Sequence, residues 1–196
     1  CIDKRSSSET SESINSMFKW YKDADECYVY LSDYDGSDQL SDLSSCRWFS
    51  RGWTLQELIA PRCIRVYDKN WIYHVSINKT KPRDEWTSYL SKVTGIDPYV
   101  FSGVELHKFS VAQRMSWASR RNTTRSEDMA YSLLGIFGIN MPLLYGEGRD
   151  RAFLRLQEEI IKGNNDMSIF AWMNPTNTTS GILATSPADF QNSGAI

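Results

Sequence analysis

The chain has 196 residues, a length that suits one domain or one and a half. Hydrophobic residues make up 41% of the sequence and aromatic residues 13%, and this composition excludes a disordered or fibrous protein. The 22 basic and 24 acidic side chains give a net charge of −2, so no overall basic field indicates binding to nucleic acid or to an anionic membrane.

The sequence also argues against a membrane span and a metal site. The longest apolar stretch, from Tyr131 to Tyr145, is interrupted by Asn140 and Pro142 and is shorter than the roughly 18 residues that a membrane span requires. The four cysteines form no C-x-x-C pair, and the two histidines complete no zinc-ligand set, so we expect no bound metal. A low cysteine content is typical of an intracellular chain with reduced thiols, and we expect a cytoplasmic protein.

The first predicted elements are a strand end, a helix and a strand. We expect the sequence to be a piece of a longer polypeptide, because residues 1–3 (Cys-Ile-Asp), with no initiating Met, read like the end of a buried strand. From Ser6 to Lys22 the apolar residues recur at helical spacing and predict a helix. Residues 27–31 (CYVYL) predict a buried strand, and the polar residues 35–45 predict a surface loop.

A short helix is predicted over residues 51–59, and Pro61 ends it. Trp53 and Glu57 are four residues apart and share one face of this helix. A carboxylate beside an indole can have a shifted pKa and can bind sugar hydroxyls, so this pair is a candidate site. The structural alternative, favoured on spacing alone, is a core Trp beside a solvated Glu.

The remainder of the chain is predicted to be rich in helix. Residues 64–67 and 71–75 alternate like the two strands of a hairpin with a turn at 68–70. Helical spacing then predicts four helices, at 86–93, 111–119, 126–137 and 147–162. The tail from 180 to 190 is predicted to be irregular and to be held in place by its apolar residues.

Two further patterns are typical of phosphate sites, and each has a structural alternative. Forked guanidinium groups bind phosphates, and four arginines are close in sequence, at Arg114, Arg120, Arg121 and Arg125. The favoured alternative is a set of ion pairs with Glu127, Asp128 and Glu147. Residues 145–148 (Tyr-Gly-Glu-Gly) match neither known phosphate-loop motif and predict a turn and a helix cap.

Several motifs together resemble the fungal heterokaryon incompatibility (HET) domain. The most specific is Arg-Gly-Trp-Thr-Leu-Gln-Glu-Leu at 51–58, which Ala60-Pro61 follows. The others are Cys-Ile-Asp-Lys at 1–4, Ile-Asn-Ser-Met at 14–17, Arg-Met-Ser-Trp-Ala at 114–118, Ala-Tyr-Ser-Leu-Leu-Gly at 130–135 and Met-Pro-Leu-Leu-Tyr-Gly-Glu-Gly at 141–148. The resemblance implies that residues 1–62 are the C-terminal part of a HET core and that residues 63–196 are a helix-rich associated region.

The HET core is thought to be a distant relative of the TIR domain, and the order of elements here resembles the TIR pattern. The resemblance implies an α/β fold with a partial parallel sheet and flanking helices, followed by a helix-rich region with a short β-hairpin. In TIR enzymes that cleave NAD the matching glutamate is catalytic, so Glu57 is implied as the catalytic residue and Trp53 as part of the pocket. Ligands of open α/β sheets bind at the carboxyl ends of strands, where we expect Asp3 and Ser32 to contact NAD.

Two functions follow from these observations. The first is self/non-self recognition and cell-death signalling with NAD as the substrate cleaved at Glu57, without a required cofactor and with self-assembly. The second is a non-catalytic signalling module that assembles with protein partners. A cavity facing Glu57 favours the first, whereas pairing of Glu57 with Arg62 or Arg65 favours the second. Nucleic-acid binding is not favoured, because the net charge is near zero.

Overall fold

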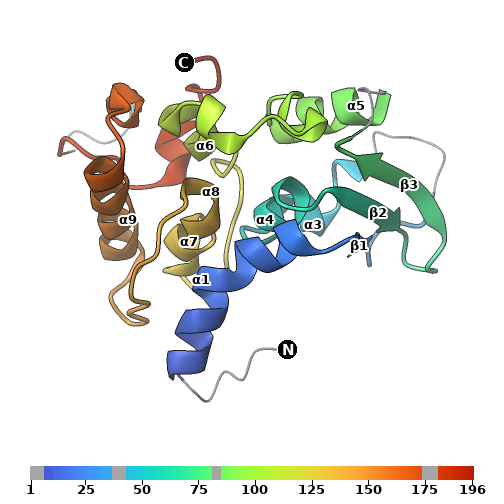
Figure 1. Ribbon diagram of the computed structural model, residues 1–196, viewed down its shortest axis with the longest axis horizontal. Helices are drawn as coiled ribbons and strands as arrows, with labels where there is room; N and C mark the ends of the chain where they lie inside the picture. Colours follow the sequence, from blue (N-terminus) through green and yellow to red (C-terminus); the bar gives the residue numbers. More distant parts are fainter. Residues whose placement is uncertain (1–6, 37–42, 81–84, 174–180) are drawn as a thin grey trace.

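The computed structural model describes residues 7–36, 43–80, 85–173 and 181–196 (Figure 1). The predicted strand end at residues 1–3, with Asp3, lies outside these ranges. The elements are α1 (Ser7–Asp23), β1 (Cys27–Tyr30), α3 (Arg47–Ser50), α4 (Thr54–Ile59), β2 (Cys63–Tyr67), β3 (Tyr73–Asn78), α5 (Glu85–Thr94), η1 (Val100–Ser102), η2 (Leu106–Lys108), α6 (Val111–Ser116), α7 (Asp128–Tyr131), α8 (Leu134–Phe137), α9 (Arg149–Gly163), η3 (Met167–Phe170) and η4 (Pro187–Phe190).

The sheet of the described residues has three strands in the order β1-β2-β3. β1 pairs in parallel with β2, with Val29 opposite Val66, and β2 pairs antiparallel with β3, with Val66 opposite Val75. The predicted hairpin is therefore confirmed, and it continues the sheet that β1 begins. The result is an α/β fold with a mixed sheet and flanking helices. The parallel pair joins residues on either side of position 62, where the predicted HET core ends.

The helices pack into one hydrophobic core with the sheet. α1 contacts both α4 and α8, α7 packs against α9, and α6 contacts the short helices η3 and η4. Figure 1 shows the sheet at one end of the molecule and α9 at the other. The largest fully buried side chains come from both ends, and they include Leu31, Phe101, Tyr131, Phe153 and Phe190. Buried Ala184 and Phe190 hold the tail in place as predicted, whereas Ile182 is exposed and residues 187–190, predicted to be irregular, form η4.

Two predicted helices differ from the structure: one starts later than predicted, and one is split in two. The helix predicted from residue 51 starts at Thr54, because Arg51 forms an isolated bridge with Asn122 and the Gly52 amide donates to the Asn122 carbonyl at 2.8 Å. A Cβ at Gly52 would lie 2.5 Å from Thr123 Cγ2, so this close approach requires glycine. The helix predicted over 126–137 is split into α7 and α8, with a tighter turn at Leu133, whose amide bonds to the Ala130 carbonyl.

The hairpin turn displays a group of exposed aromatic rings. Trp71 has a φ of +60° and lies in the turn, so the second strand starts at Tyr73 and not at residue 71 as predicted. The Trp71 side chain is 63% exposed and stacks on Tyr30 at a centroid distance of 4.7 Å. Tyr67 contacts the rings of both Trp71 and Tyr73. We call Tyr30, Tyr67, Trp71 and Tyr73 the aromatic cluster of the sheet.

Asp68 fixes this turn from a buried position. Its Oδ1 accepts hydrogen bonds from the amides of Asn70 and Ile72, at 2.8 and 3.0 Å, and its Oδ2 lies 3.1 Å from His74 Nε2. Burial by itself would raise the pKa of this carboxyl, but the hydrogen bonds from His74 and the two amides outweigh it and lower the pKa.

We expect Asp68 to make the stability of the fold depend on pH. A carboxyl with a lowered folded-state pKa stabilises the protein above its unfolded-state pKa, and this stabilisation is lost as the pH falls through the folded-state pKa. Urea unfolding between pH 7 and pH 3 should therefore show a steeper loss of stability for the unmodified chain than for Asp68→Asn. Equal slopes would contradict this role for the carboxylate.

Candidate functional site

The carboxylate of Glu57 is held by donors from two other helices. Trp48 Nε1, from α3, donates to Glu57 Oε2 at 3.0 Å, and the Tyr21 hydroxyl, from α1, donates to Glu57 Oε1 at 3.3 Å. Burial, followed by the charge of Glu57, raises the pKa of Tyr21 and raises that of Cys27 to about 11. Glu57 is thus a half-buried, oriented acid at the point where α1, α3 and α4 meet.

A buried arginine lies within electrostatic reach of Glu57. Arg121 Nη1 donates to the Arg51 carbonyl and to Thr54 Oγ1, each at 2.9 Å, and only 4% of the residue is exposed. Burial lowers the pKa of Arg121 to about 10, and the negative charge of Glu57 opposes that effect. Arg121 Nη2 has no hydrogen-bond partner among the residues that the structure describes. Glu57 therefore supplies counter-charge to a buried cation.

Trp53 and Glu57 have different hydrogen-bond partners in the structure. Trp53 Nε1 donates to Asp128 Oδ2 at 3.0 Å, and the ring packs against the core. The other oxygen of Asp128 accepts from the Tyr145 hydroxyl at 2.8 Å. Trp53 therefore connects α4 to the start of α7, whereas Glu57 faces Tyr21 and Trp48.

Ser32 lies beside a cavity of about 440 Å³ near the carboxyl end of β1. The described residues that line it are mostly polar: Tyr30, Ser32, Asp33, Arg47, Trp48, Ser50, Arg51, Asn122, Thr123 and Thr124. Arg47 Nε forms an ion pair with Asp33 at 3.2 Å, and its Nη2 donates to Ser32 Oγ at 3.4 Å. Glu57 is not in this described lining, but Trp48 connects it to the cavity, because the same residue lines the space and donates to Glu57.

The two arginines suggested as counter-ions of Glu57 lie elsewhere. Arg65 forms an ion pair with Glu26 at 2.5 Å, and Arg62 is exposed. The arginine that electrostatically couples to Glu57 is Arg121, which the sequence reasoning assigned to a basic patch.

The four arginines from 114 to 125 do not act as one phosphate-binding patch. Arg114 is buried, donates to the Ile136 carbonyl at 3.2 Å and lies over the Phe137 ring. Arg121 is buried against α4, and Arg125 lies 4.4 Å from the centroid of the Tyr145 ring. The alternative prediction, that these arginines form ion pairs with nearby acids, is wrong for Glu147, because Glu147 pairs with Arg155.

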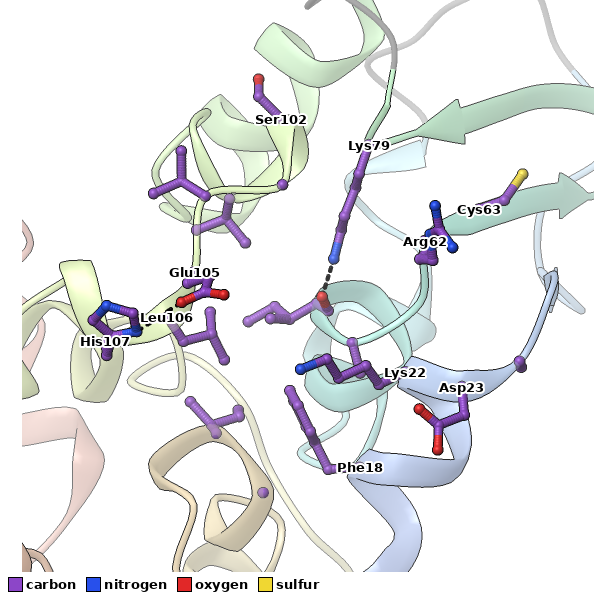
Figure 2. A pocket seen from close by; sticks show the side chains of 18 of the residues that line it. Phe18, Lys22, Asp23, Arg62, Cys63, Lys79, Ser102, Glu105, Leu106 and His107 are labelled. Carbon is purple, nitrogen blue, oxygen red and sulfur yellow. Dashed lines mark hydrogen bonds and ion pairs between the residues drawn. The ribbon is translucent and has the colours of Figure 1, made fainter.

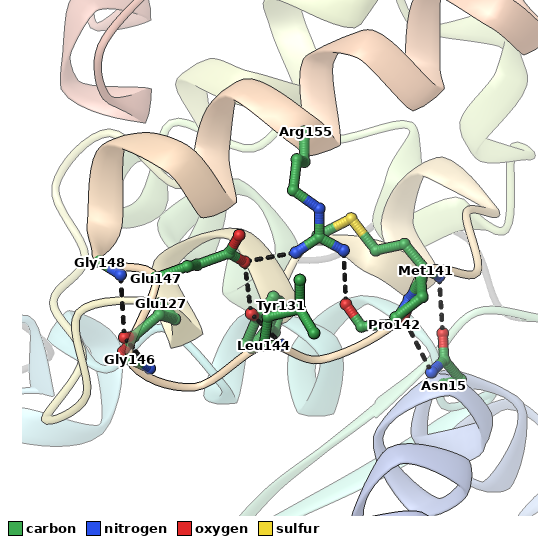
Figure 3. A network of polar contacts seen from close by, with 10 residues as sticks. All are labelled: Asn15, Glu127, Tyr131, Met141, Pro142, Leu144, Gly146, Glu147, Gly148 and Arg155. Atoms are coloured by element: carbon green, nitrogen blue, oxygen red, sulfur yellow. Dashed lines mark hydrogen bonds and ion pairs between the residues drawn. The ribbon is translucent and has the colours of Figure 1, made fainter.

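An internal carboxylate occupies the glycine turn at residues 145–148. Glu127 Oε1 accepts from the amides of Gly146 and Gly148, at 2.8 and 3.2 Å (Figure 3). A hydrogen bond from its own backbone amide, together with those from Gly146 and Gly148, outweighs burial and lowers the pKa of Glu127. The turn is therefore a structural one, as predicted. Sequence reasoning missed Glu127 as its partner, since the two are 19 residues apart in the chain.

Comparison with known proteins identifies the family. The chain is 45% identical over 170 residues, 83% of its length, to the vegetative incompatibility protein HET-E-1 of Podospora anserina. The chain belongs to the fungal heterokaryon incompatibility family. It spans 12% of the length of this relative. Residues 151–195 of the HET-family chain, from α9 to η4, also match a family model described as a domain of unknown function (DUF8212).

No solved structure matches the HET-family chain, so the TIR-like relationship stays a prediction. None of its described helices has the length and apolar character needed to cross a membrane. Within the same described ranges, no group of three or more His, Cys, Asp or Glu side chains is arranged to hold a metal ion.

Proposed function

We propose that this chain acts in fungal self/non-self recognition and cell-death signalling, as a part of a larger incompatibility protein. The 45% identity to a vegetative incompatibility protein supports this proposal. The matching segment is 12% of that relative, so further parts of such a protein carry the trigger and the partner recognition in this proposal.

We further propose that the chain signals by cleaving the nicotinamide–ribose bond of NAD, with Glu57 as the catalytic carboxylate. The C–N bond breaks with its electron pair going to nicotinamide, water adds to the ribose carbon, and one proton is released to solvent. A fixed carboxylate stabilises the positive charge that develops on the ribose in the transition state. One group of this kind suffices, because nicotinamide leaves as a neutral molecule.

The observation that supports this chemistry best is the position of Glu57 behind Trp48. Both oxygens of the carboxylate are oriented by hydrogen bonds, and the indole that orients one of them lines the 440 Å³ cavity. The same cavity offers Arg47 and Arg51 for phosphates and Ser32 for a ribose hydroxyl. In this proposal the Trp48 ring moves aside when the nicotinamide riboside enters, and Glu57 then reaches the ribose.

Glu57→Gln tests the reaction. The amide keeps an oxygen acceptor but removes the charge, so we expect nicotinamide release from NAD by the purified chain to fall by about 100-fold. Chromatographic detection of nicotinamide measures the rate. Glu158→Gln is the matched control, because Glu158 is an exposed glutamate on α9. Equal rates for the two variants, with both folded by circular dichroism, would contradict a catalytic role for Glu57.

A non-catalytic assembly module is the second candidate function, and two observations favour it. Glu57 balances the buried charge of Arg121, which is a structural role. The aromatic cluster of the sheet exposes rings of a kind that is enriched at protein interfaces, including Trp71 and Tyr73. If expression of the chain kills fungal cells while their NAD content stays unchanged, this second function replaces the first.

A further inference from the structure

A second cavity, which Glu57 does not line, has a volume of about 1120 Å³. It is bounded by the C-terminal end of α1, the end of α4, the end of β3, the segment from η1 to η2, and α8 (Figure 2). Its volume is slightly above the usual range of small-molecule sites in proteins, about 300 to 1,000 Å³. None of the residues assigned to NAD cleavage lines it, so the two sites are independent.

Two lysines from different elements reach into this cavity. Lys22 comes from the last turn of α1, and Lys79 follows the end of β3. Figure 2 shows their side chains entering the same space from opposite sides. Lys79 Nζ donates to the carbonyl of Ile59, the last residue of α4. An ammonium group has three donors, so two N–H bonds of Lys79 remain for a ligand after this contact.

The positive charge of Lys22 disfavours the ammonium form of Lys79. Burial, followed by the charge of Lys22, lowers the pKa of Lys79 to about 8. Part of the wall is apolar, with Phe18, Ile59 and Phe137 among its residues, and a low-polarity wall strengthens such repulsion. An anion between the two groups removes the repulsion and gains two charge-assisted hydrogen bonds.

Three acids, Asp23, Asp25 and Glu105, also line the described cavity. Glu105 is directed to His107, with its Oε2 3.1 Å from His107 Nδ1. Figure 2 shows Asp23 on the side of α1 away from the Lys22 ammonium. Arg62 and Arg114 also line the cavity and add positive charge to its wall, although the Arg114 guanidinium already donates to the Ile136 carbonyl.

We propose that this cavity binds a small organic phosphate, with the phosphate between Lys22 and Lys79 and the body of the ligand against the apolar wall. A phosphate monoester carries close to two negative charges at neutral pH, which matches two ammonium groups better than a single carboxylate does. The carbon skeleton of the ligand accounts for the volume and for the aromatic side chains, which an inorganic ion would leave unused.

Calorimetric titration of the full chain tests the proposal with phenyl phosphate, inorganic phosphate and benzoate as probes. We expect phenyl phosphate to bind more tightly than either of the others. Lys22→Gln and Lys79→Gln should each weaken its binding by about tenfold or more, because each removes one charged donor. Lys19→Gln is the control, since Lys19 is exposed one turn earlier on α1 and does not line the described cavity; its affinity should be unchanged.

The structural alternative is that Lys79 only caps the C-terminal end of α4. In that case Lys79→Gln lowers stability without a change in phenyl phosphate affinity, and Lys22→Gln behaves like Lys19→Gln. Either result overturns the proposal, as does the absence of phenyl phosphate binding to the folded chain. If Lys79→Gln does not fold, Lys22→Gln decides the outcome. Loss of NAD cleavage in Glu57→Gln should leave phenyl phosphate binding intact, so the two proposals fail separately.

Discussion

Replacing Gly135 with alanine is expected to lower the free energy of unfolding by about 3 kcal/mol. Gly135 is inside α8, where α8 packs against α1, and an added Cβ would overlap the Cβ and ring of Phe18. The overlapping Cβ is attached directly to the backbone of α1, so rotation of the Phe18 ring cannot remove the clash. Alanine favours a helix by about 1 kcal/mol over glycine, and the steric term exceeds this gain.

Gly163→Ala is the matched control for this substitution. Gly163 is the last residue of α9, and a Cβ there meets no atom within 4 Å. Urea unfolding followed by circular dichroism should show a large loss of stability for Gly135→Ala and a change within about 0.5 kcal/mol for Gly163→Ala. If the two variants have the same unfolding midpoint, the close packing of α8 on α1 is wrong.

Replacing Glu127 with alanine is expected to cost about 2 to 3 kcal/mol. The buried Glu127 carboxylate accepts from the amides of Gly146 and Gly148, and alanine would leave both donors without this acceptor. The turn that they form leads directly into α9, whose first residue is Arg149. We therefore expect the loss of stability to come with loosening of this turn.

Hydrogen exchange distinguishes this effect from a general loss of stability. In Glu127→Ala the amides of Gly146 and Gly148 should exchange faster than they do in the unmodified chain, under conditions where the chain stays folded. The amides in the middle of α9 should show a smaller increase. Glu158→Ala removes an exposed glutamate from α9 and should change neither exchange nor stability. Unchanged exchange at both glycines in Glu127→Ala would show that the carboxylate does not hold the turn.

The elements with strong local patterns could be predicted from sequence. α1, β1, α5 and α9 and the hairpin of β2 and β3 lie close to their predicted ranges, because apolar spacing and flanking turn residues specify them locally. The start of α4 and the break between α7 and α8 could not be predicted in this way. The start of α4 depends on the bridge between Arg51 and the distant Asn122, and at the break the Ser132 carbonyl accepts from Gln56 Nε2 of α4 at 2.8 Å.

Of the candidate site, only the motif that contains Glu57 could be predicted from the sequence. The R-G-W-T-L-Q-E-L segment identifies Glu57, but Tyr21 and Arg121 are far from it in sequence and nothing in their spacing indicates that they face it. Arg114 and Arg121 were predicted to bind phosphate or, as the favoured alternative, to form ion pairs, since a sequence does not show that a charged side chain is buried against carbonyl groups. The cavity lined by Lys22 and Lys79 likewise depends on side chains from α1 and from the segment after β3 that only the fold brings together.

The parallel pairing of β1 with β2 has a consequence for how loss-of-function variants are interpreted. Parallel neighbours cannot be joined by a tight turn, and here the connection between Tyr30 and Cys63 contains α3 and α4. The R-G-W-T-L-Q-E-L motif is therefore part of the connection between the two paired strands. A substitution in it can lower activity by preventing the two strands from pairing, so the abundance of folded protein has to be measured before any residue of the motif is assigned to chemistry.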